Sequence, residues 1–258
     1  MKKDACLGID VGSRSVKMAF AEHGKILDFL IFDTPKFYRD LCGRTTEGLF
    51  IKPDALPYNI TGMTGCGYGR DCLGFEGVEI VTEMKAHAAG GVLQTGLSDF
   101  LLLDLGGQDS KLLVVRNGKM TEFVSNDRCA ACTGRFLENM AAVLGMELGE
   151  LSAHHLNPAA LSSTCAVFAE TELISRMASG EPRESLAAGV NYSIFRRVAG
   201  MVGRFPKGKL LFAGGVAANI AILKYLKDEG WDVVELKYPR HNAALGCLYL
   251  SGRIKKFG

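Results

Sequence analysis

Two cysteines stand directly ahead of stretches that are predicted to form amphipathic helices. Cys129 precedes a predicted helix at Gly134–Leu144, and Cys165 precedes another at Ala166–Ala178. The first turn of a helix leaves backbone N–H groups unpaired and carries the positive end of the helix dipole. Thiolates and an anionic iron–sulfur cluster both gain stability in that environment. This placement therefore indicates chemistry that depends on cysteine thiolates.

Two further segments, Asp10–Ser13 and Asp104–Gln108, place an acid at the end of an apolar strand, with glycine two residues later. Glycine lets the backbone approach a phosphate closely and presents N–H groups to it. The carboxylate can hold Mg²⁺, directly or through water. One Asp-x-Gly turn is common, but two at equivalent places predict a phosphate site. Gly214–Gly215, between a predicted strand and a helix, suits a nucleotide packed against backbone.

The predicted strands form two equivalent sets, each with an Asp-x-Gly turn after the first strand and a hairpin turn after the second. They are predicted at Ala5–Asp10, Val16–Ala21 and Ile26–Phe32, and again at Phe100–Leu105, Lys111–Arg116 and Met120–Val124. This repeated order indicates the internal duplication of a β-rich αβ unit.

The remaining segments are mostly helical. Lys36–Cys72 is rich in glycine and shows no clear periodicity, whereas Glu83–Leu93 is predicted to be a helix. A strand is predicted at Lys209–Ala213, and further helices at Pro182–Val202, Asn219–Glu229 and Asn242–Ile254. We therefore expect an α/β protein with an N-terminal lobe over residues 1–95, a C-terminal lobe over 96–240, and a C-terminal helix within 241–258 that packs back on the N-terminal lobe.

Composition narrows the classes of partner. The 258 residues are 22% charged and 48% hydrophobic, and the net charge of +2 gives no reason to expect nucleic acid or an anionic membrane as partner. The apolar run Cys6–Val11 is too short for the core of a signal peptide, and no stretch reaches the roughly 18 apolar residues of a membrane span. We expect a cytoplasmic protein, in which the eight cysteines are thiols or metal ligands rather than disulfides.

The motifs together resemble the activators of 2-hydroxyacyl-CoA dehydratases, a family that includes the ATPase subunits of benzoyl-CoA reductases. The resemblance runs from end to end of the chain and is carried by Asp104–Lys111, Asn126–Glu138, Thr164–Glu170 and Ala213–Asn219. It implies the fold shared by acetate and sugar kinases, Hsp70 and actin, with two ribonuclease H-like domains and a nucleotide cleft between the lobes. It also implies an ATP-dependent one-electron reductase, a homodimer with one [4Fe–4S] cluster at the subunit interface.

On this reading MgATP is bound by both Asp-x-Gly turns. Asp10 and Asp104 hold Mg²⁺, Lys17 contacts a phosphate, and Gln108 orients the attacking water. The other residues expected to bind the nucleotide are Gly12, Ser13, Arg14, Ser15, Gly106, Gly107, Gly134, Gly214, Gly215 and Asn219. Reduced ferredoxin or flavodoxin supplies the electron. Hydrolysis changes the angle between the lobes, and a partner iron–sulfur enzyme, such as a dehydratase, receives the electron.

The resemblance places the cluster ligands on Cys129 and Cys165 of each subunit. Cys132 departs from the family pattern, in which a glycine is usual at this position. Three readings of Cys132 stay open: a bystander thiol, an alternative cluster ligand, and a redox dithiol with Cys129. Zinc is disfavoured because the sequence offers no clear fourth ligand nearby.

Several residues have no predicted role in the chemistry. Cys42, Cys66 and Cys72 are expected to be structural or solvent-facing thiols, and His87 a structural histidine; Cys6 and Cys247 are expected in the core. The alternative functions are a small-molecule kinase of the same fold, the ATPase subunit of a benzoyl-CoA-type or double-cubane reductase, and a regulatory ATP-binding module. Cysteines at two helix starts argue against the kinase.

Overall fold

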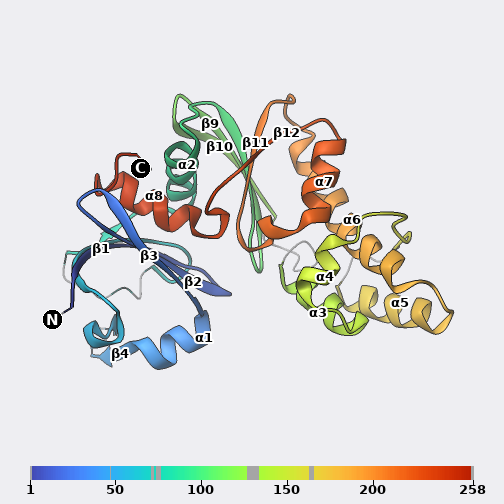
Figure 1. Ribbon diagram of the computed structural model, residues 1–258, viewed down its shortest axis with the longest axis horizontal. Coiled ribbons are helices and arrows are strands. Elements are labelled where there is room, and N and C mark those ends of the chain that lie inside the picture. The colour runs from blue at the N-terminus through green and yellow to red at the C-terminus, as the bar shows by residue number, and fades with distance from the viewer. Residues whose placement is uncertain are drawn as a thin grey trace. The chain divides into compact units, whose positions relative to one another are not determined.

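The computed structural model describes residues 2–46, 48–70, 73, 77–126, 134–162 and 166–256 (Figure 1). The chain divides into two compact units: the first is formed by residues 1–99, 114–121 and 236–258, and the second by 100–113 and 122–235. Across these described ranges, every helix is too short or too polar to span a membrane.

The first unit contains a five-stranded sheet in the order β3-β2-β1-β6-β7. Its central strand β1 (Asp4–Val11) pairs antiparallel with β2 (Ser15–Glu22) and parallel with β6 (Asn59–Cys66). The edge strands are β3 (Lys25–Asp33) and β7 (Glu79–Ile80). Most of β1 is buried, as expected for a strand with helices or loops on both faces. The sheet thereby holds the end of β1, where Asp10 lies, inside the unit.

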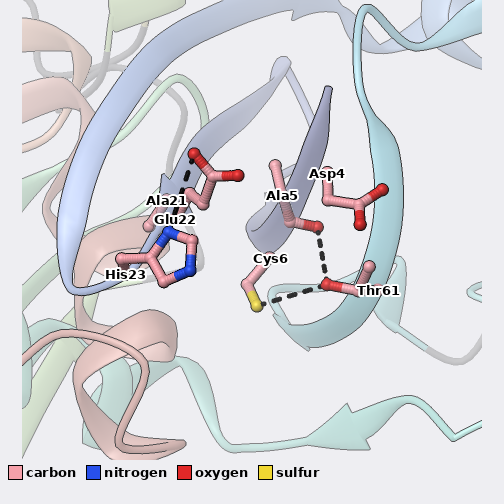
Figure 2. Close-up of a pocket in the computed structure, with 7 residues that line it drawn as sticks. All are labelled: Asp4, Ala5, Cys6, Ala21, Glu22, His23 and Thr61. Atoms are coloured by element: carbon pink, nitrogen blue, oxygen red, sulfur yellow. Dashed lines mark hydrogen bonds and ion pairs between the residues drawn. The ribbon is translucent and has the colours of Figure 1, made fainter. Parts of the chain in front are cut away.

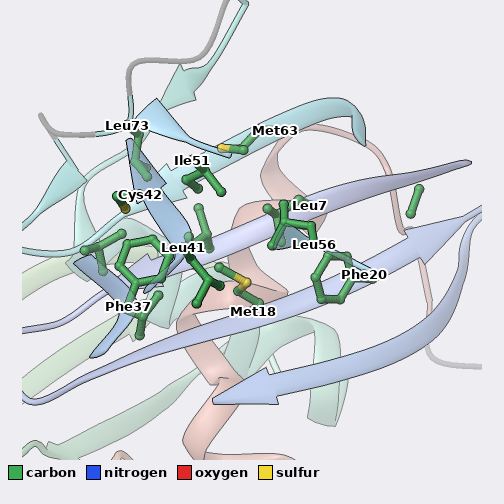
Figure 3. Close-up of a cluster of buried hydrophobic side chains, with 14 residues drawn as sticks. Leu7, Met18, Phe20, Phe37, Leu41, Cys42, Ile51, Leu56, Met63 and Leu73 are labelled. Carbon is green, nitrogen blue, oxygen red and sulfur yellow. The ribbon is translucent and has the colours of Figure 1, made fainter. Parts of the chain in front are cut away.

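The two faces of this sheet are covered by different segments. One face packs against η1 (Phe37–Leu41), which follows α1 (Thr34–Lys36), and against the small sheet of β4 (Cys42–Thr45) and β5 (Gly48–Ile51). The core on this face includes Leu7, Met18, Phe20, Phe37 and Leu56, the last of which follows η2 (Pro53–Ala55) (Figure 3). On the other face α8 (Asn242–Leu250) packs against β1 and α2 (Glu83–Thr95). Residues far apart in sequence therefore fix β1 from both sides.

The second unit repeats this sheet in the order β10-β9-β8-β11-β12. Its strands are β8 (Phe100–Leu105), β9 (Ser110–Arg116), β10 (Lys119–Asn126), β11 (Lys209–Ala213) and β12 (Asp232–Glu235). Strand β11 is parallel to both β8 and β12. The helices are α3 (Gly134–Leu144), α4 (Leu148–Ala153), α5 (Ala166–Ala178), α6 (Arg183–Val202) and α7 (Ile220–Asp228), and the 3-10 turn η5 (Gly215–Ala218) follows β11. A second 3-10 turn, η6 (Pro239–His241), belongs to the first unit and contacts β2 and α8.

The duplicated α/β architecture predicted from the strands and turns is confirmed, because both sheets have the same strand order. Five strands of the described residues were not predicted: β4, β5, β6, β7 and β12. The last helix ends at Leu250 and not at the predicted Ile254, because Gly252 adopts a φ of +71° and Arg253 N–H donates to Leu248 O at 3.0 Å. This is the glycine cap that commonly ends a helix.

Candidate functional site

The first Asp-x-Gly turn is predicted to bind phosphate and is called the first phosphate turn below; its acid is buried at the end of β1. Asp10 is 5% exposed, and Lys17, its antiparallel partner on β2, places Nζ 3.1 Å from Asp10 Oδ2. The other oxygen, Oδ1, is buried and accepts no hydrogen bond from any residue that the structure describes. A buried carboxylate with one oxygen unsatisfied gains from further positive charge nearby. The oxygen donor and its charge therefore fit Mg²⁺.

The turn that follows Asp10 is held by the last residue of β3 and the first residue of α1. Thr34 Oγ1 donates to Gly12 O at 2.7 Å, and Thr34 N–H donates to Arg14 O at 3.2 Å. The Arg14 guanidinium forms an ion pair with Asp33, while Ser13 is exposed. The backbone of the turn is therefore anchored, and of these side chains Ser13 is the most accessible to a ligand.

The second phosphate turn is bonded to the start of α3. Asp104 is 4% exposed on β8, and Gly106 N–H closes the turn on Asp109 O at 3.0 Å. Gly134 N–H donates to Gly106 O at 2.9 Å, and Arg135 N–H donates to Gly107 O at 3.1 Å. The first two N–H groups of α3 thus bind the phosphate turn itself. A movement of this turn would therefore also move the start of α3.

The third loop joins this site from β11. Gly214 has a φ of +92°, and η5 follows it; a Cβ at Gly134 would lie 3.5 Å from Val216 Cγ2, so η5 contacts the start of α3. The structure therefore brings together the end of β8, the start of α3 and the loop after β11 within the second unit. Gln108 and Gly215 are exposed there, and Gly107 is half-buried.

The Asn219 side chain is buried and forms hydrogen bonds to other residues of the second unit. Its Oδ1 accepts from Ile222 N–H at 2.9 Å and caps α7, and its Nδ2 donates to Asn191 Oδ1 at 2.9 Å. Asn191 Nδ2 in turn donates to Leu151 O at 2.7 Å and His154 O at 2.9 Å. Asn219 thereby anchors the loop that begins at Gly214. Sequence reasoning missed Asn191 and Thr34, since neither belongs to a motif.

The cysteines expected to bind a cluster, Cys129, Cys132 and Cys165, lie outside the described residues, as does Cys72. The helices that follow the first and last of them, α3 and α5, have the bounds predicted from the sequence. These two helices pack against each other within the second unit.

The remaining cysteines divide into buried and partly exposed thiols. Cys42, Cys66 and Cys247 are buried, so the core position expected for Cys247 is confirmed. A hydrogen bond with Cys247, together with burial, raises the pKa of the Cys66 thiol well above its ordinary value. The Cys66 thiol therefore stays protonated, and it packs with Cys247, Ala86 and Ala243 in one buried cluster.

Cys6 was expected in the core, and this is wrong. It is partly exposed and lines a pocket of about 270 Å³ with Thr61 and His23 (Figure 2). Arg253 Nη1 donates to its Sγ at 3.0 Å. An apolar strand pattern does not reveal that one of its positions borders a pocket. Because Cys6 lies near the start of β1 and Asp10 near its end, this pocket is separate from the phosphate turn.

His87, expected to be a structural histidine, lies inside the first unit. It is buried in α2, and Asn242 Nδ2 donates to His87 O at 2.9 Å and lies 3.2 Å from His87 Nδ1. This contact joins α2 to the first turn of α8.

The chain matches the BadF/BadG/BcrA/BcrD ATPase family over residues 7–251 and belongs to this family. It is similar to the (R)-2-hydroxyglutaryl-CoA dehydratase activating ATPase of Acidaminococcus fermentans, with 34% identity over 253 residues that cover 93% of this chain and 94% of the relative. The predicted family resemblance is thus confirmed, and the chain is an ATPase by family.

Two solved structures resemble the whole chain. The crystal structure of the A. fermentans (R)-2-hydroxyglutaryl-CoA dehydratase component A has a TM-score of 0.80 and 31% identity, and the comparison covers 96% of this chain and 97% of that one. The activator of the 2-hydroxyisocaproyl-CoA dehydratase from Clostridium difficile, with bound ADPNP, has a TM-score of 0.80 and 27% identity, with coverage of 98% and 99%. Together with the duplicated sheets, these neighbours confirm the predicted fold class.

Proposed function

We propose that this ATPase couples hydrolysis of MgATP to the transfer of one electron to a partner iron–sulfur enzyme, with a 2-hydroxyacyl-CoA dehydratase as the favoured partner. Two activators of such dehydratases resemble the chain over nearly its whole length, and one of them binds an ATP analogue. Asp10 and Asp104 would position Mg²⁺, Lys17 would contact a phosphate, and Gln108 would orient the attacking water.

One observation carries the coupling between nucleotide and cysteines. The carbonyl groups of Gly106 and Gly107 accept the first N–H groups of α3, and Cys129 lies between β10 and α3 in the sequence. A displacement of the phosphate turn on hydrolysis would therefore displace the start of α3. Coupling then requires only that the partner enzyme bind one nucleotide state better than the other.

The cysteines of two subunits would complete the redox centre. Cys129 and Cys165 from each chain supply the four thiolates that a [4Fe–4S] cluster needs, and a two-fold axis meets that need with one self-complementary surface. The cluster would store a single low-potential electron supplied by ferredoxin or flavodoxin. Cys132 is assigned as a bystander thiol, because Cys129 and Cys165 already complete the ligand set.

The test is the iron content of anaerobically purified variants. Wild-type protein is expected to be a brown dimer with about four iron atoms and matching sulfide. Cys129→Ser and Cys165→Ser should each lose the iron, since a hydroxyl binds iron far less well than a thiolate does. Cys132→Ser should keep most of it, and Cys6→Ser, at a partly exposed cysteine of the first unit, is the matched control.

Three outcomes would contradict parts of the proposal. A colourless wild-type protein that hydrolyses ATP would instead be a nucleotide-binding module without redox chemistry. A monomer that carries four iron atoms would exclude the bridging cluster, and loss of iron in Cys132→Ser alone would contradict the ligand assignment.

The coupling route has its own test. Gly134→Pro removes the N–H that binds Gly106 O, while proline is well tolerated at the first helical position. We expect fewer electrons delivered per ATP hydrolysed. Leu148→Pro, at the first residue of α4, makes the same change at another helix start and should leave this ratio unchanged. An unchanged ratio in Gly134→Pro would exclude this hydrogen bond as the route.

A further inference from the structure

The loop Gly67–Arg70 occupies the same place in the first unit as the Gly214 loop does in the second. Strand β6 is parallel to β1, with Cys66 opposite Asp10, and strand β11 is parallel to β8, with Ala213 opposite Asp104. The next residue is Gly67 in one unit and Gly214 in the other. Each glycine therefore follows the strand that lies beside the acid of its phosphate turn.

The two glycines have nearly the same positive φ. Gly67 has a φ of +94° and Gly214 a φ of +92°. A Cβ at Gly67 would lie 2.7 Å from Asp10 Oδ1 and 2.6 Å from Val11 O. A Cβ at Gly214 would lie 2.5 Å from Asp104 Oδ1 and 2.3 Å from Leu105 O. Both the positive φ and these contacts exclude any residue with a side chain.

We propose that Gly67 and Gly214 are positioning residues that hold the carboxylates of Asp10 and Asp104 in the orientation needed for metal and phosphate. The proposal rests on the function proposed above, in which both acids position Mg²⁺. The glycine backbone lies against Oδ1 of each acid. In the first unit, the other carboxylate oxygen, Asp10 Oδ2, then faces Lys17 and lies 3.1 Å from its Nζ.

The Gly67 loop cannot easily move to admit a side chain. Gly69 N–H donates to Val11 O at 3.0 Å, and Arg70 Nη1 donates to Gly67 O at 3.1 Å. The first bond ties the loop to Val11 at the end of β1, and the second closes the loop on itself. A methyl group at residue 67 must therefore displace the Asp10 carboxylate or break this attachment.

The test compares Gly67→Ala with a glycine of similar φ but different surroundings. Gly24 has a φ of +77° and no atom within 4 Å of a Cβ, so Gly24→Ala places a side chain at a positive φ without the contact. Gly67→Ala should lower the ATPase kcat on the order of 100-fold, the loss typical of a misplacement by about 1 Å. Gly24→Ala should keep full activity and lower Tm by only a few degrees.

A double variant distinguishes a loss of activity caused by displacement of the Asp10 carboxylate from one caused by general disruption of the fold. If Gly67 acts through Asp10, then Gly67→Ala combined with Asp10→Ala is no slower than Asp10→Ala alone. The Mg²⁺ concentration for half-maximal activity should rise in Gly67→Ala as it does in Asp10→Ala. Gly214→Ala with Asp104→Ala repeats the comparison in the other unit, which keeps the test available if Gly67→Ala does not fold.

Two results would overturn the inference, and they differ in what else they imply. Additive losses in the double variants, or equal losses in Gly67→Ala and Gly24→Ala, would exclude positioning while leaving the proposed function intact. Normal ATPase activity in Asp10→Ala and Asp104→Ala would contradict the proposed function as well.

Discussion

Asn191 connects Asn219, which follows the Gly214 loop, to the end of α4, and replacing it with alanine tests how much this connection contributes to stability. The change removes three hydrogen bonds: two from Asn191 Nδ2, at 2.7 Å to Leu151 O and 2.9 Å to His154 O, and one from Asn219 Nδ2 to Asn191 Oδ1 at 2.9 Å. Asn191 is fully buried and Asn219 is 4% exposed. Water therefore cannot easily replace the lost partner.

The size of the effect follows from these contacts. Each hydrogen bond contributes about 1 kcal/mol net, and a buried donor left without a partner costs about 1–3 kcal/mol. Asn191→Ala is thus expected to lower the free energy of unfolding by about 3–4 kcal/mol. The KM for ATP should rise, because Asn219 caps the helix that follows the Gly214 loop.

The assay is urea unfolding followed by tryptophan fluorescence. The chain has one tryptophan, Trp231, which is 4% exposed in the second unit and reports on the unit that contains Asn191. Ser193→Ala is the control on the same helix, since it removes only a bond from Ser193 Oγ to Val190 O, and should cost less than about 1 kcal/mol.

A double variant shows whether the two asparagines act as a pair. Asn191→Ala and Asn219→Ala each leave the other side chain without its partner, so the double variant should lose less than the sum of the single losses. A loss below about 1 kcal/mol in Asn191→Ala, or strictly additive losses, would refute the reasoning.

Three further predictions concern the acid, the histidine and the thiols. Asp104→Ala should reduce ATP turnover on the order of 100-fold or more, measured by phosphate release; near-normal turnover would exclude its role with the metal. Burial lowers the pKa of His241 to about 4, so the histidine is neutral in the folded protein, while its unfolded pKa is about 6.5. The unfolded state alone gains a proton as pH falls from about 6.5 to 4, so stability that is present above this pH range is lost within it. The expected loss in the free energy of unfolding is on the order of 2 kcal/mol after allowance for solvent screening. Urea unfolding at several pH values should show a smaller dependence of stability on pH in His241→Gln than in the wild type. Iodoacetamide should label Cys6 in the folded protein and spare Cys66, whose pKa is raised by its hydrogen bond to Cys247 and by burial, as peptide mass spectrometry can show; equal labelling would contradict the burial of Cys66.

The strands differ in how well the sequence predicts them. Strand β8 was predicted with its observed bounds, because Phe100–Leu105 is an uninterrupted apolar run before a turn. Strand β6 was missed, since Asn59–Cys66 contains two glycines and two threonines and has no regular apolar alternation. Its strand conformation depends on parallel pairing with β1, more than 50 residues away along the chain. Local pattern alone does not specify such a partner.

The sequence by itself determined the local features: the acid–glycine turns, the hairpins that follow them, and the helices that begin after Cys129 and Cys165. These depend on residues within a few positions of one another, so periodicity and turn chemistry reveal them. The tertiary structure decided which distant groups meet. It placed Gly67 against Asp10 and Asn191, 28 residues from Asn219, within hydrogen-bonding distance. Such contacts arise from strand pairing and helix packing across the chain, and no spacing in the sequence encodes them.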